Sequence, residues 1–240
     1  MGLTDLHCHI LPGIDDGARD LEDAVAMARQ AAADGIGTVC ATPHIRHDHD
    51  VRLAELGTRV EELQRAVSAA GVPVRIVTGG EVAETTFDGL TDEELRRVSL
   101  GGANTWILLE PRPGPLGPSL IGVAESLSAG GRQIVVAHPE RHVGPGFREA
   151  LAAVVARGAL VQATAAHLTD EGAGPVLVEL AAEGLVHLVA SDSHSACAGR
   201  PVAISAALER LGAAEREFAA RAPAAIVRGE PVEPPQARAG

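Results

Sequence analysis

The sequence contains no lysine and no tyrosine, and aromatic residues make up only 2 % of it. The core must therefore be filled mainly by alanine, valine, leucine and isoleucine, in a chain whose hydrophobic residues amount to 46 %. All 20 basic side chains are arginines, and 32 acidic side chains give a formal net charge of −12. This balance argues against nucleic acid as a partner, because binding to a phosphate backbone requires clustered cations.

Long apolar runs are also missing from the sequence. No run is long enough to span a bilayer, so we expect no membrane insertion. The first residues show neither the basic nor the apolar segment of a secretory signal peptide. Cys8, Cys40 and Cys197 are an odd number of thiols without zinc-finger spacing, which is typical of reduced cysteines in the cytoplasm. We therefore predict a cytoplasmic protein.

Short apolar runs of β type alternate along the chain with amphipathic runs of helical type. Continuous apolar runs are typical of strands that are buried on both faces of a parallel sheet. The predicted strands are residues 3–7, 38–41, 74–78, 105–109, 133–137, 159–163 and 186–190. The predicted helices are residues 21–34, 53–70, 92–98, 119–129, 147–157, 174–183, 201–211 and 213–221.

Capping residues support several of these helix boundaries. Asp20 and Thr91 stand where N-caps belong. The positions where predicted helices should end carry Gly35, Gly71, Gly130 and Gly158.

The repeated strand–helix unit predicts an α/β fold with a parallel sheet. Seven such units favour a closed, TIM-like barrel in a single domain over residues 1–230, followed by a loose tail at 231–240. An open doubly wound sheet is the alternative, but no glycine-rich phosphate loop follows the first strand.

Histidines and acidic residues stand at the end of nearly every predicted strand. Asp5, His7 and His9 alternate at the start of the chain, so their side chains share one face of the strand. The later strand ends carry Asp16 (preceded by Asp15), His44, Glu81, Glu110, His138, Asp192 and His194. Each residue alone would most simply be a solvated loop residue or a structural histidine. Because the strand ends of a parallel barrel meet on one face, the set predicts a cluster of two or three divalent metal ions.

Two arginines follow these segments closely. Arg141 and Arg200 could bind the oxygens of a phosphate group, although Arg200 could equally be a surface cation. Metal ions polarise a phosphoryl oxygen, so metals and arginines at one mouth predict hydrolysis of a phosphate ester. We interpret His47 and His49 as solvated loop residues.

Thiol chemistry is a different mechanism for the same reaction. A cysteine phosphatase needs the pattern Cys-x5-Arg, in which the loop wraps the phosphate around a thiolate. Cys197 and Arg200 are too close together for this pattern, and neither Cys8 nor Cys40 has an arginine at the required offset. The sequence therefore favours metal chemistry.

At this point the motifs resemble a known family. The run 5–17 (DLHCHILPGIDDG) is similar to the opening of the polymerase and histidinol phosphatase (PHP) superfamily. More narrowly, it resembles the bacterial manganese-dependent protein-tyrosine phosphatases of capsule and exopolysaccharide loci. The motifs ATPH (41–44), GE (80–81), LE (109–110), AHPER (137–141), SDSH (191–194) and RP (200–201) follow in the expected order. The resemblance extends from about residue 3 to residue 230.

The resemblance implies a distorted seven-stranded (β/α) barrel of the PHP type with three metal ions, which could be manganese, iron or zinc. It implies that His7, His9, Glu81 and Asp192 hold one ion, that Glu81, Glu110 and His138 hold a second, and that Asp16, His44 and His194 hold a third. Arg141 and Arg200 would bind the phosphate, and a metal-bound hydroxide would attack it.

The implied substrate is a phosphotyrosine in the tail of a bacterial tyrosine kinase. A small phosphomonoester such as histidinol phosphate, and a non-catalytic regulatory PHP domain, are the alternatives. Three departures from the family pattern fall near the mouth or its packing: His142, His167 and the pair Ala222-Pro223.

Overall fold

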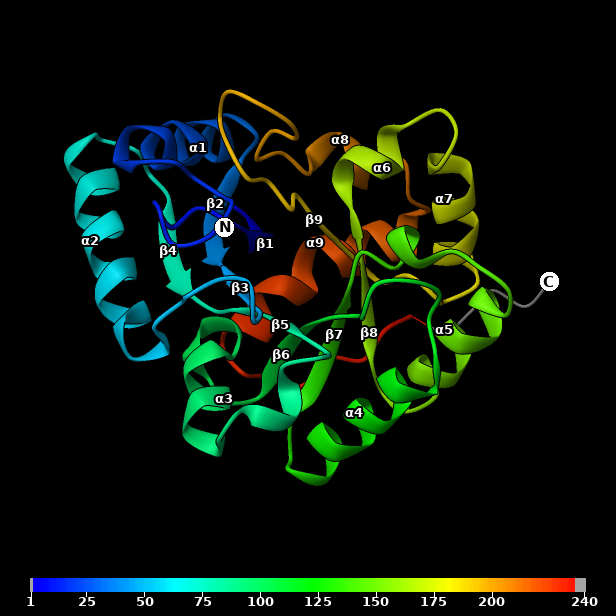
Figure 1. Cartoon of the computed structure of the whole chain (residues 1–240). Coiled ribbons are helices and arrows are strands. Elements are labelled where there is room, and N and C mark those ends of the chain that lie inside the picture. Colours follow the sequence, from blue (N-terminus) through cyan, green and yellow to red (C-terminus); the bar gives the residue numbers. More distant parts are fainter. Residues whose placement is uncertain (1, 236–240) are drawn as a thin grey trace.

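The strands form two parallel sheets in the computed structural model, which describes residues 2–235 (Figure 1). The smaller sheet has the order β1-β2-β4 and contains β1 (Leu3–Cys8), β2 (Ile36–Ala41) and β4 (Arg75–Thr78). The larger sheet has the order β3-β5-β6-β7-β8-β9 and contains β3 (His44–Ile45), β5 (Glu81–Ala83), β6 (Trp106–Glu110), β7 (Gln133–Ala137), β8 (Leu160–Thr164) and β9 (Leu188–Ala190). All of these pairings are parallel, which confirms the predicted α/β class.

Two bent strands run from one sheet into the other. Only Thr42-Pro43 separates β2 from β3, and only Gly79-Gly80 separates β4 from β5. With each pair taken as one bent strand, the order around the sheets gives the seven strand positions expected from the sequence. The outer strands also meet, because the amide of His9 after β1 donates a hydrogen bond to the carbonyl of Ser193 after β9 at 2.9 Å. The fold is the predicted distorted barrel, bent where the two strands break.

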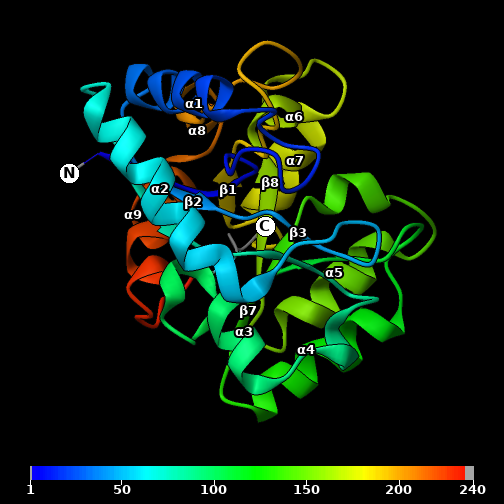
Figure 2. The ribbon, with the colours of Figure 1, turned by 60° about the vertical axis from the view of Figure 1, so that its left-hand side comes forward.

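Helices surround these strands (Figures 1 and 2). They are α1 (Leu21–Ala33), α2 (Leu56–Ala69), α3 (Asp92–Val98), α4 (Pro118–Ala129), α5 (Phe147–Val155), α6 (Ala165–Thr169), α7 (Gly174–Ala182), α8 (Ser205–Leu208) and α9 (Ala213–Val227). Short 3-10 turns lie at η1 (Leu53–Glu55), η2 (Phe87–Gly89), η3 (Leu100–Gly102) and η4 (Pro139–His142). Their inward faces and the strands share an almost purely aliphatic core, as the scarcity of aromatic residues predicts.

A second, smaller core fills the interior of the barrel. Here Leu108 and Leu188 pack with Ala222 and Ile226 of α9. Trp106, at the first residue of β6, belongs to the same cluster, and its indole N–H donates to the carbonyl of Glu230 at 3.1 Å. Helix α9 therefore closes the barrel at the amino ends of the strands, and the carboxyl ends remain available for a site.

The predicted N-caps are confirmed. Asp20 accepts a hydrogen bond from the amide of Asp23 at 2.9 Å, and Thr91 forms a capping box with Glu94 at the start of α3. A capping side chain satisfies amides that have no partner within the helix, which stabilises the first turn.

Helix α4 ends at Ala129 with Gly130 as its C-cap, as predicted, and Gly131, with φ 75°, takes the left-handed position after it. Two other expectations about the helices are wrong. The predicted helix at 201–211 contains only the short α8. Helix α9 does not end at residue 221 but continues through Pro223 to Val227, because Pro223 and its neighbours are buried against the barrel. This burial offsets the hydrogen bond that a proline cannot donate.

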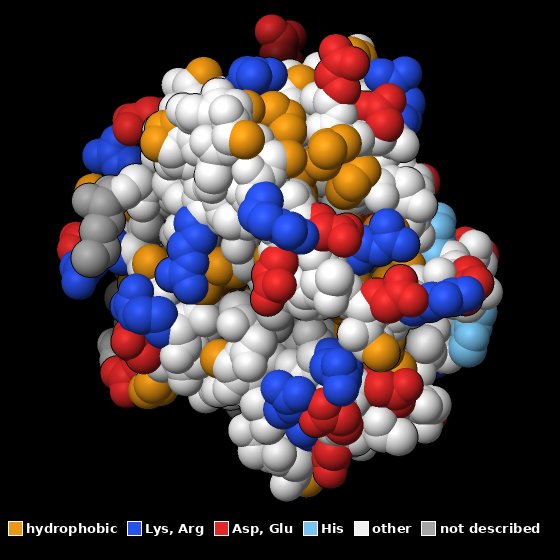
Figure 3. All heavy atoms as spheres, turned by 90° about the vertical axis from the view of Figure 1, so that its left-hand side faces the viewer, with side chains coloured by type: hydrophobic (Ala, Val, Ile, Leu, Met, Phe, Trp, Pro, Cys, Tyr) orange, Lys and Arg blue, Asp and Glu red, His pale blue; other side chains and the backbone are white. Residues whose placement is uncertain are grey.

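The surface carries few large apolar side chains. Among the described residues these are Leu21, Val143 and Val176. On the face shown in Figure 3, arginines are interspersed with acidic side chains, and histidines reach the surface at one edge. None of the described helices combines the length and apolar character needed to cross a membrane.

The predicted tail begins with residues 231–235, which form neither helix nor strand. Val232 nevertheless packs, partly buried, against the interior cluster. Residues 236–240 lie outside the described residues, so the domain boundary at residue 230 stays a prediction.

His187 gives the fold a pH-dependent stability that does not involve the strand-end cluster. It is buried between β8 and β9, where its Nδ1 accepts a hydrogen bond from the amide of Val161 at 3.1 Å. Burial lowers the pKa of His187 from 6.5 to about 4. As the pH falls from 6.5 towards 4, His187 becomes protonated in the unfolded chain but stays neutral in the native chain. The free energy of unfolding therefore falls over this window by about 2–3 kcal/mol.

We expect His187→Gln, which keeps a hydrogen-bond acceptor, to remove this contribution. Urea unfolding of both proteins at pH 7 and pH 4.5 measures the effect, because all other titrating groups are common to the pair. Stability profiles that stay parallel between these two pH values would contradict the assignment.

Candidate metal centre

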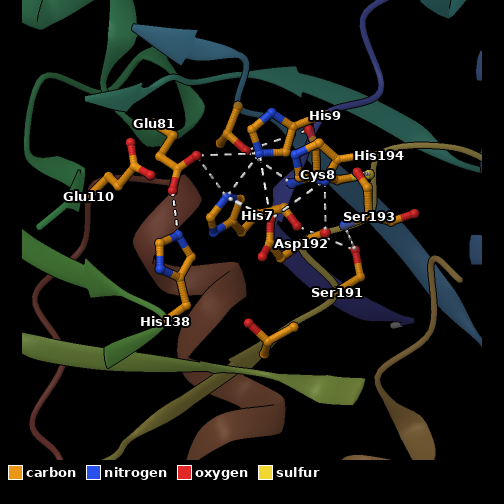
Figure 4. A network of polar contacts seen from close by, with 12 residues as sticks. His7, Cys8, His9, Glu81, Glu110, His138, Ser191, Asp192, Ser193 and His194 are labelled. Carbon is orange, nitrogen blue, oxygen red and sulfur yellow. Dashed lines mark hydrogen bonds and ion pairs between the residues drawn. The ribbon is translucent and has the colours of Figure 1, made fainter. Parts of the chain in front are cut away.

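The first strand delivers two histidines to the carboxyl end of the barrel. His7 and His9 are both fully buried, and their Nε2 atoms lie 3.1 Å apart (Figure 4). Two carboxylates complete the same group. Glu81 Oε2 lies 3.3 Å from each of these nitrogens, and Asp192 Oδ1 lies 3.4 Å from the first and 3.6 Å from the second. Two imidazoles and two carboxylates thus converge on one point.

A second group forms on the other side of Glu81. Its Oε1 lies 2.7 Å from His138 Nε2, and its Oε2 lies 2.9 Å from His44 Nδ1. Glu110, at the end of β6, approaches the same histidine, with 3.9 Å between Oε2 and Nδ1. Both oxygens of Glu81 thus face histidine nitrogens, as the oxygens of a carboxylate that bridges two ions would.

A third group lies nearest the solvent. Asp16 Oδ1 lies 3.4 Å from His44 Nε2 and 3.5 Å from His194 Nε2. The ring of His194 stacks on that of His9 at 3.9 Å between centroids. The structure thus brings all nine predicted ligands into one continuous cluster, in which four residues each belong to two sets of neighbouring ligands: His7, His9, His44 and Glu81.

These donor atoms fit divalent cations. Ligand atoms lie within 4.8 Å of one another in four overlapping sets of side chains: His7, His9 and Asp192; His7, Glu81 and His138; His44, Glu81 and Glu110; and His9, Asp16, His44 and His194. Among the described residues, the buried atoms Glu81 Oε2, His44 Nδ1, His138 Nδ1 and Asp192 Oδ1 have no hydrogen-bond partner. A buried polar atom without a partner is costly, and a coordinated cation would satisfy several of these atoms at once.

Backbone strain is found at two of the predicted ligands. His138 has φ 30° and Asp192 has φ 49°, a region that non-glycine residues rarely occupy. Such conformations persist where the surrounding structure holds them, and they cluster at functional sites. His138 directly follows β7, and Asp192 is the second residue after β9. Both side chains belong to the cluster.

Two residues that sequence reasoning missed hold the first two histidines in place. Asp15 Oδ2 lies 2.9 Å from His9 Nδ1, and Gln162 Oε1 lies 2.9 Å from His7 Nδ1. An acceptor at Nδ1 keeps the proton there and leaves the Nε2 lone pair free for a metal. A polar Gln162 within an apolar strand was the available signal, and Asp15 was visible only as the neighbour of Asp16.

The environment of Asp15 explains why it stays ionised. Burial opposes its charge, but the hydrogen bond from His9 and those from the amides of His44 and Gly17 lower the pKa of Asp15 to about 2.

Asp5, by contrast, does not join the cluster. Its carboxylate accepts hydrogen bonds from the amides of Ser191 and His7, and burial raises the pKa of Asp5 to about 6.

Both predicted arginines contact the same carboxylate. Arg141 Nη2 and Arg200 Nη2 bind Asp192 Oδ2, the latter at 3.0 Å, and Arg200 also donates to the Asp192 carbonyl at 2.7 and 2.9 Å. The two side chains line a cavity of about 430 Å³, together with ligands of the second and third groups. Arg46, which was not predicted, lines this cavity too.

Four further histidines lie outside the predicted ligand set. His47 is exposed as expected, but the expectation is wrong for His49, which is partly buried and stacks on His44 at 5.2 Å. His142 is buried, and its ring centroid lies 6.1 Å from that of His138. Its Nδ1 contacts the carbonyl of Gly114 at 3.0 Å. His167 is partly exposed and contacts Glu140 at 3.1 Å.

The cysteines are poorly suited to nucleophilic catalysis. Cys8 and Cys40 are buried, and burial raises the pKa of both thiols, to about 12 for Cys40. Cys197 is exposed and does not line the cavity. None of the three combines a low-pKa thiol with access to the cavity.

Fold and site together define a class: a (β/α) barrel in which a cluster of histidines and carboxylates that could hold divalent cations lies beside an arginine-lined cavity. The chain belongs to the capsular polysaccharide synthesis family CpsB/CapC, whose family model matches residues 3–221. It is 31 % identical over 204 residues to the tyrosine-protein phosphatase YwqE of Bacillus subtilis, covering 80 % of this chain and 78 % of the relative. It is 24 % identical over 202 residues to the putative tyrosine-protein phosphatase CapC of Staphylococcus aureus, covering 80 % and 77 %.

A solved structure agrees with this family assignment. A chain from the crystal structures of YwqE from Bacillus subtilis and CpsB from Streptococcus pneumoniae superimposes with a TM-score of 0.82 at 26 % identity. The alignment covers 99 % of this chain and all of that chain, and those proteins are described as unique metal-dependent tyrosine phosphatases.

Proposed function

We propose that the chain is a metal-dependent phosphomonoesterase that removes phosphate from tyrosine side chains of a protein. The observation that carries this proposal is the cavity of about 430 Å³ in which arginines stand beside predicted metal ligands. Divalent cations held by these ligands, together with the neighbouring guanidinium groups, would suit a phosphate dianion. The relatives named as tyrosine phosphatases support the same substrate chemistry.

The proposed ligand set is His7, His9, Asp16, His44, Glu81, Glu110, His138, Asp192 and His194. It suits three ions, and manganese, iron and zinc all accept mixed histidine and carboxylate ligands. Bound divalent ions polarise a phosphoryl oxygen and lower the pKa of water near them, so that a nucleophile is available near neutral pH.

The arginines bind and orient the phosphate in this proposal. Arg141 and Arg200 are each held by Asp192, so little side-chain entropy is lost when they engage a substrate. Their charges also offset negative charge that grows on the phosphoryl oxygens. A phenolate leaves readily, so tyrosine phosphate needs little help from a general acid.

For the partner, we propose the phosphotyrosine-bearing tail of a bacterial tyrosine kinase, met in the cytoplasm. Arg141 and Arg200 are 34 % and 27 % exposed at the side chain, so the cavity opens to solvent and can admit a side chain that projects from a protein. A small phosphomonoester such as histidinol phosphate is the alternative substrate, and a non-catalytic regulatory role is the alternative of another class.

Metal removal tests this function. We expect EDTA to abolish hydrolysis of p-nitrophenyl phosphate and of a phosphotyrosyl peptide, and added Mn²⁺ to restore it, with the peptide preferred over histidinol phosphate. Preference for histidinol phosphate would point to the small-molecule alternative. A metal-loaded protein that hydrolyses none of the three would favour the regulatory role.

A further inference from the structure

We propose that Arg46 is a third phosphate-binding arginine, which binds the phosphate group of the substrate together with Arg141 and Arg200. The inference rests on the proposed function, because it concerns the same cavity. Arg46 directly follows β3, and its side chain is one-third exposed at the cavity wall.

The three arginines reach the cavity from separate parts of the barrel. Arg46 follows β3, Arg141 lies in η4 after β7, and Arg200 lies beyond the end of β9. In the sheet order these strands are not neighbours. The guanidinium groups of Arg141 and Arg200 share one anchor, Asp192, whereas Arg46 contacts Glu110 on another wall. A phosphate between them would meet positive charge from more than one direction.

The contacts of Arg46 hold its guanidinium group in place but do not use all of its N–H donors. Its Nε donates to Asp48 at 2.7 Å, and its Nη1 lies 3.3 Å and 3.4 Å from the two carboxylate oxygens of Glu110. Its Nη2 lies 3.4 Å from His49 Nε2. A guanidinium carries five N–H donors, so these contacts fix its plane and still leave donors for a phosphate oxygen.

Arg46 could instead do no more than hold Glu110, a proposed metal ligand. The two roles differ in a measurable way. A residue that holds a metal ligand changes metal affinity when it is lost, whereas a residue that touches phosphate changes phosphate affinity at unchanged metal content. Binding of inorganic phosphate, the product of any phosphomonoesterase, separates the two roles without relying on turnover.

The experiment compares the metal-loaded wild type with Arg46→Gln, Arg46→Lys and the control Arg52→Gln. Arg52 lies on the same connection, is 72 % exposed, pairs with Glu55 alone among the residues that the structure describes, and does not line this cavity. Calorimetry measures the Kd of inorganic phosphate, and elemental analysis measures bound manganese after desalting.

We expect Arg46→Gln to weaken phosphate binding by about tenfold to a hundredfold, the range for a lost hydrogen bond between charged groups. Arg46→Lys should recover part of the lost phosphate affinity, since lysine restores the positive charge but not the planar, forked arrangement of N–H donors. Arg52→Gln should bind phosphate like the wild type, and manganese content should be equal in all four proteins.

Two results would overturn the inference: phosphate binding by Arg46→Gln that equals the wild type, or a weakening that accompanies loss of manganese. A wild type that binds phosphate but hydrolyses no phosphomonoester would contradict the proposed function and leave this inference intact. The role of Arg46 in binding phosphate would then still stand on the variant series.

Discussion

Glu81→Gln lowers kcat/KM for a phosphotyrosyl peptide by about a thousandfold, the largest effect that we expect from a single substitution. Glu81 is fully buried and faces His7, His9, His44 and His138 through its two oxygens. A bridging carboxylate serves two ions, and an amide that replaces it offers one neutral oxygen and an unwanted donor. Metal ions supply several kcal/mol of charge stabilisation, and each 1.36 kcal/mol is a factor of ten in rate.

The matched control is Glu84→Gln. Glu84 is also a buried glutamate, three residues further on, but it binds Arg112 instead, through the guanidinium Nε at 2.6 Å and the backbone amide at 3.1 Å. We expect this variant to lose some stability and to keep its manganese and its turnover per folded molecule. Equal loss of turnover per folded molecule in the two variants would contradict a specific role of Glu81 in the metal cluster.

The ligands could be predicted from the sequence because their signal is local. Each one lies at or just beyond the end of an apolar run, and parallel topology alone brings such ends to one face. His138 and Asp192 lie far apart in the chain, but both belong to the cluster because β7 and β9 are strands of the larger sheet.

The supporting residues could not be predicted in this way. Gln162 and His7 are separated by 155 positions, and only the pairing of the barrel strands brings them to 2.9 Å. Arg46 looks like an ordinary loop arginine until the cavity places it near Arg141 and Arg200. Residues that act through another residue leave no periodic pattern in the sequence.

The bends of the barrel also escaped prediction, although their residues were visible. Gly79 and Gly80 interrupt a strand where a Cβ would come within 2.7 Å of Cys40 Sγ or 2.9 Å of Ile45 and Val98. Glycine is required there because neighbouring chain segments pack too closely for any side chain. The pair was read as the end of one strand, since nothing local reveals how close those neighbours come.

Asp15→Asn should lower affinity for manganese by about a hundredfold, the upper range for a lost outer partner of a metal-binding histidine. The carboxylate of Asp15 can only accept a hydrogen bond from His9 Nδ1, at 2.9 Å, and it also accepts one from the amide of His44 at 3.0 Å. An asparagine can present its own N–H to Nδ1 instead. The ring proton then moves to Nε2, the atom that faces Glu81 and Asp192, and blocks the lone pair needed for a metal.

Asp15→Ala distinguishes this tautomer effect from a simple lost contact. Alanine removes the acceptor without offering a donor, so we expect it to bind manganese more tightly than the asparagine variant does. In both variants saturating Mn²⁺ should restore most of kcat, because Asp15 orients a ligand and does not touch the substrate. Asparagine and alanine variants of equal affinity would contradict the tautomer argument. A kcat that stays low in metal-saturated protein would instead place Asp15 in contact with the reacting phosphate.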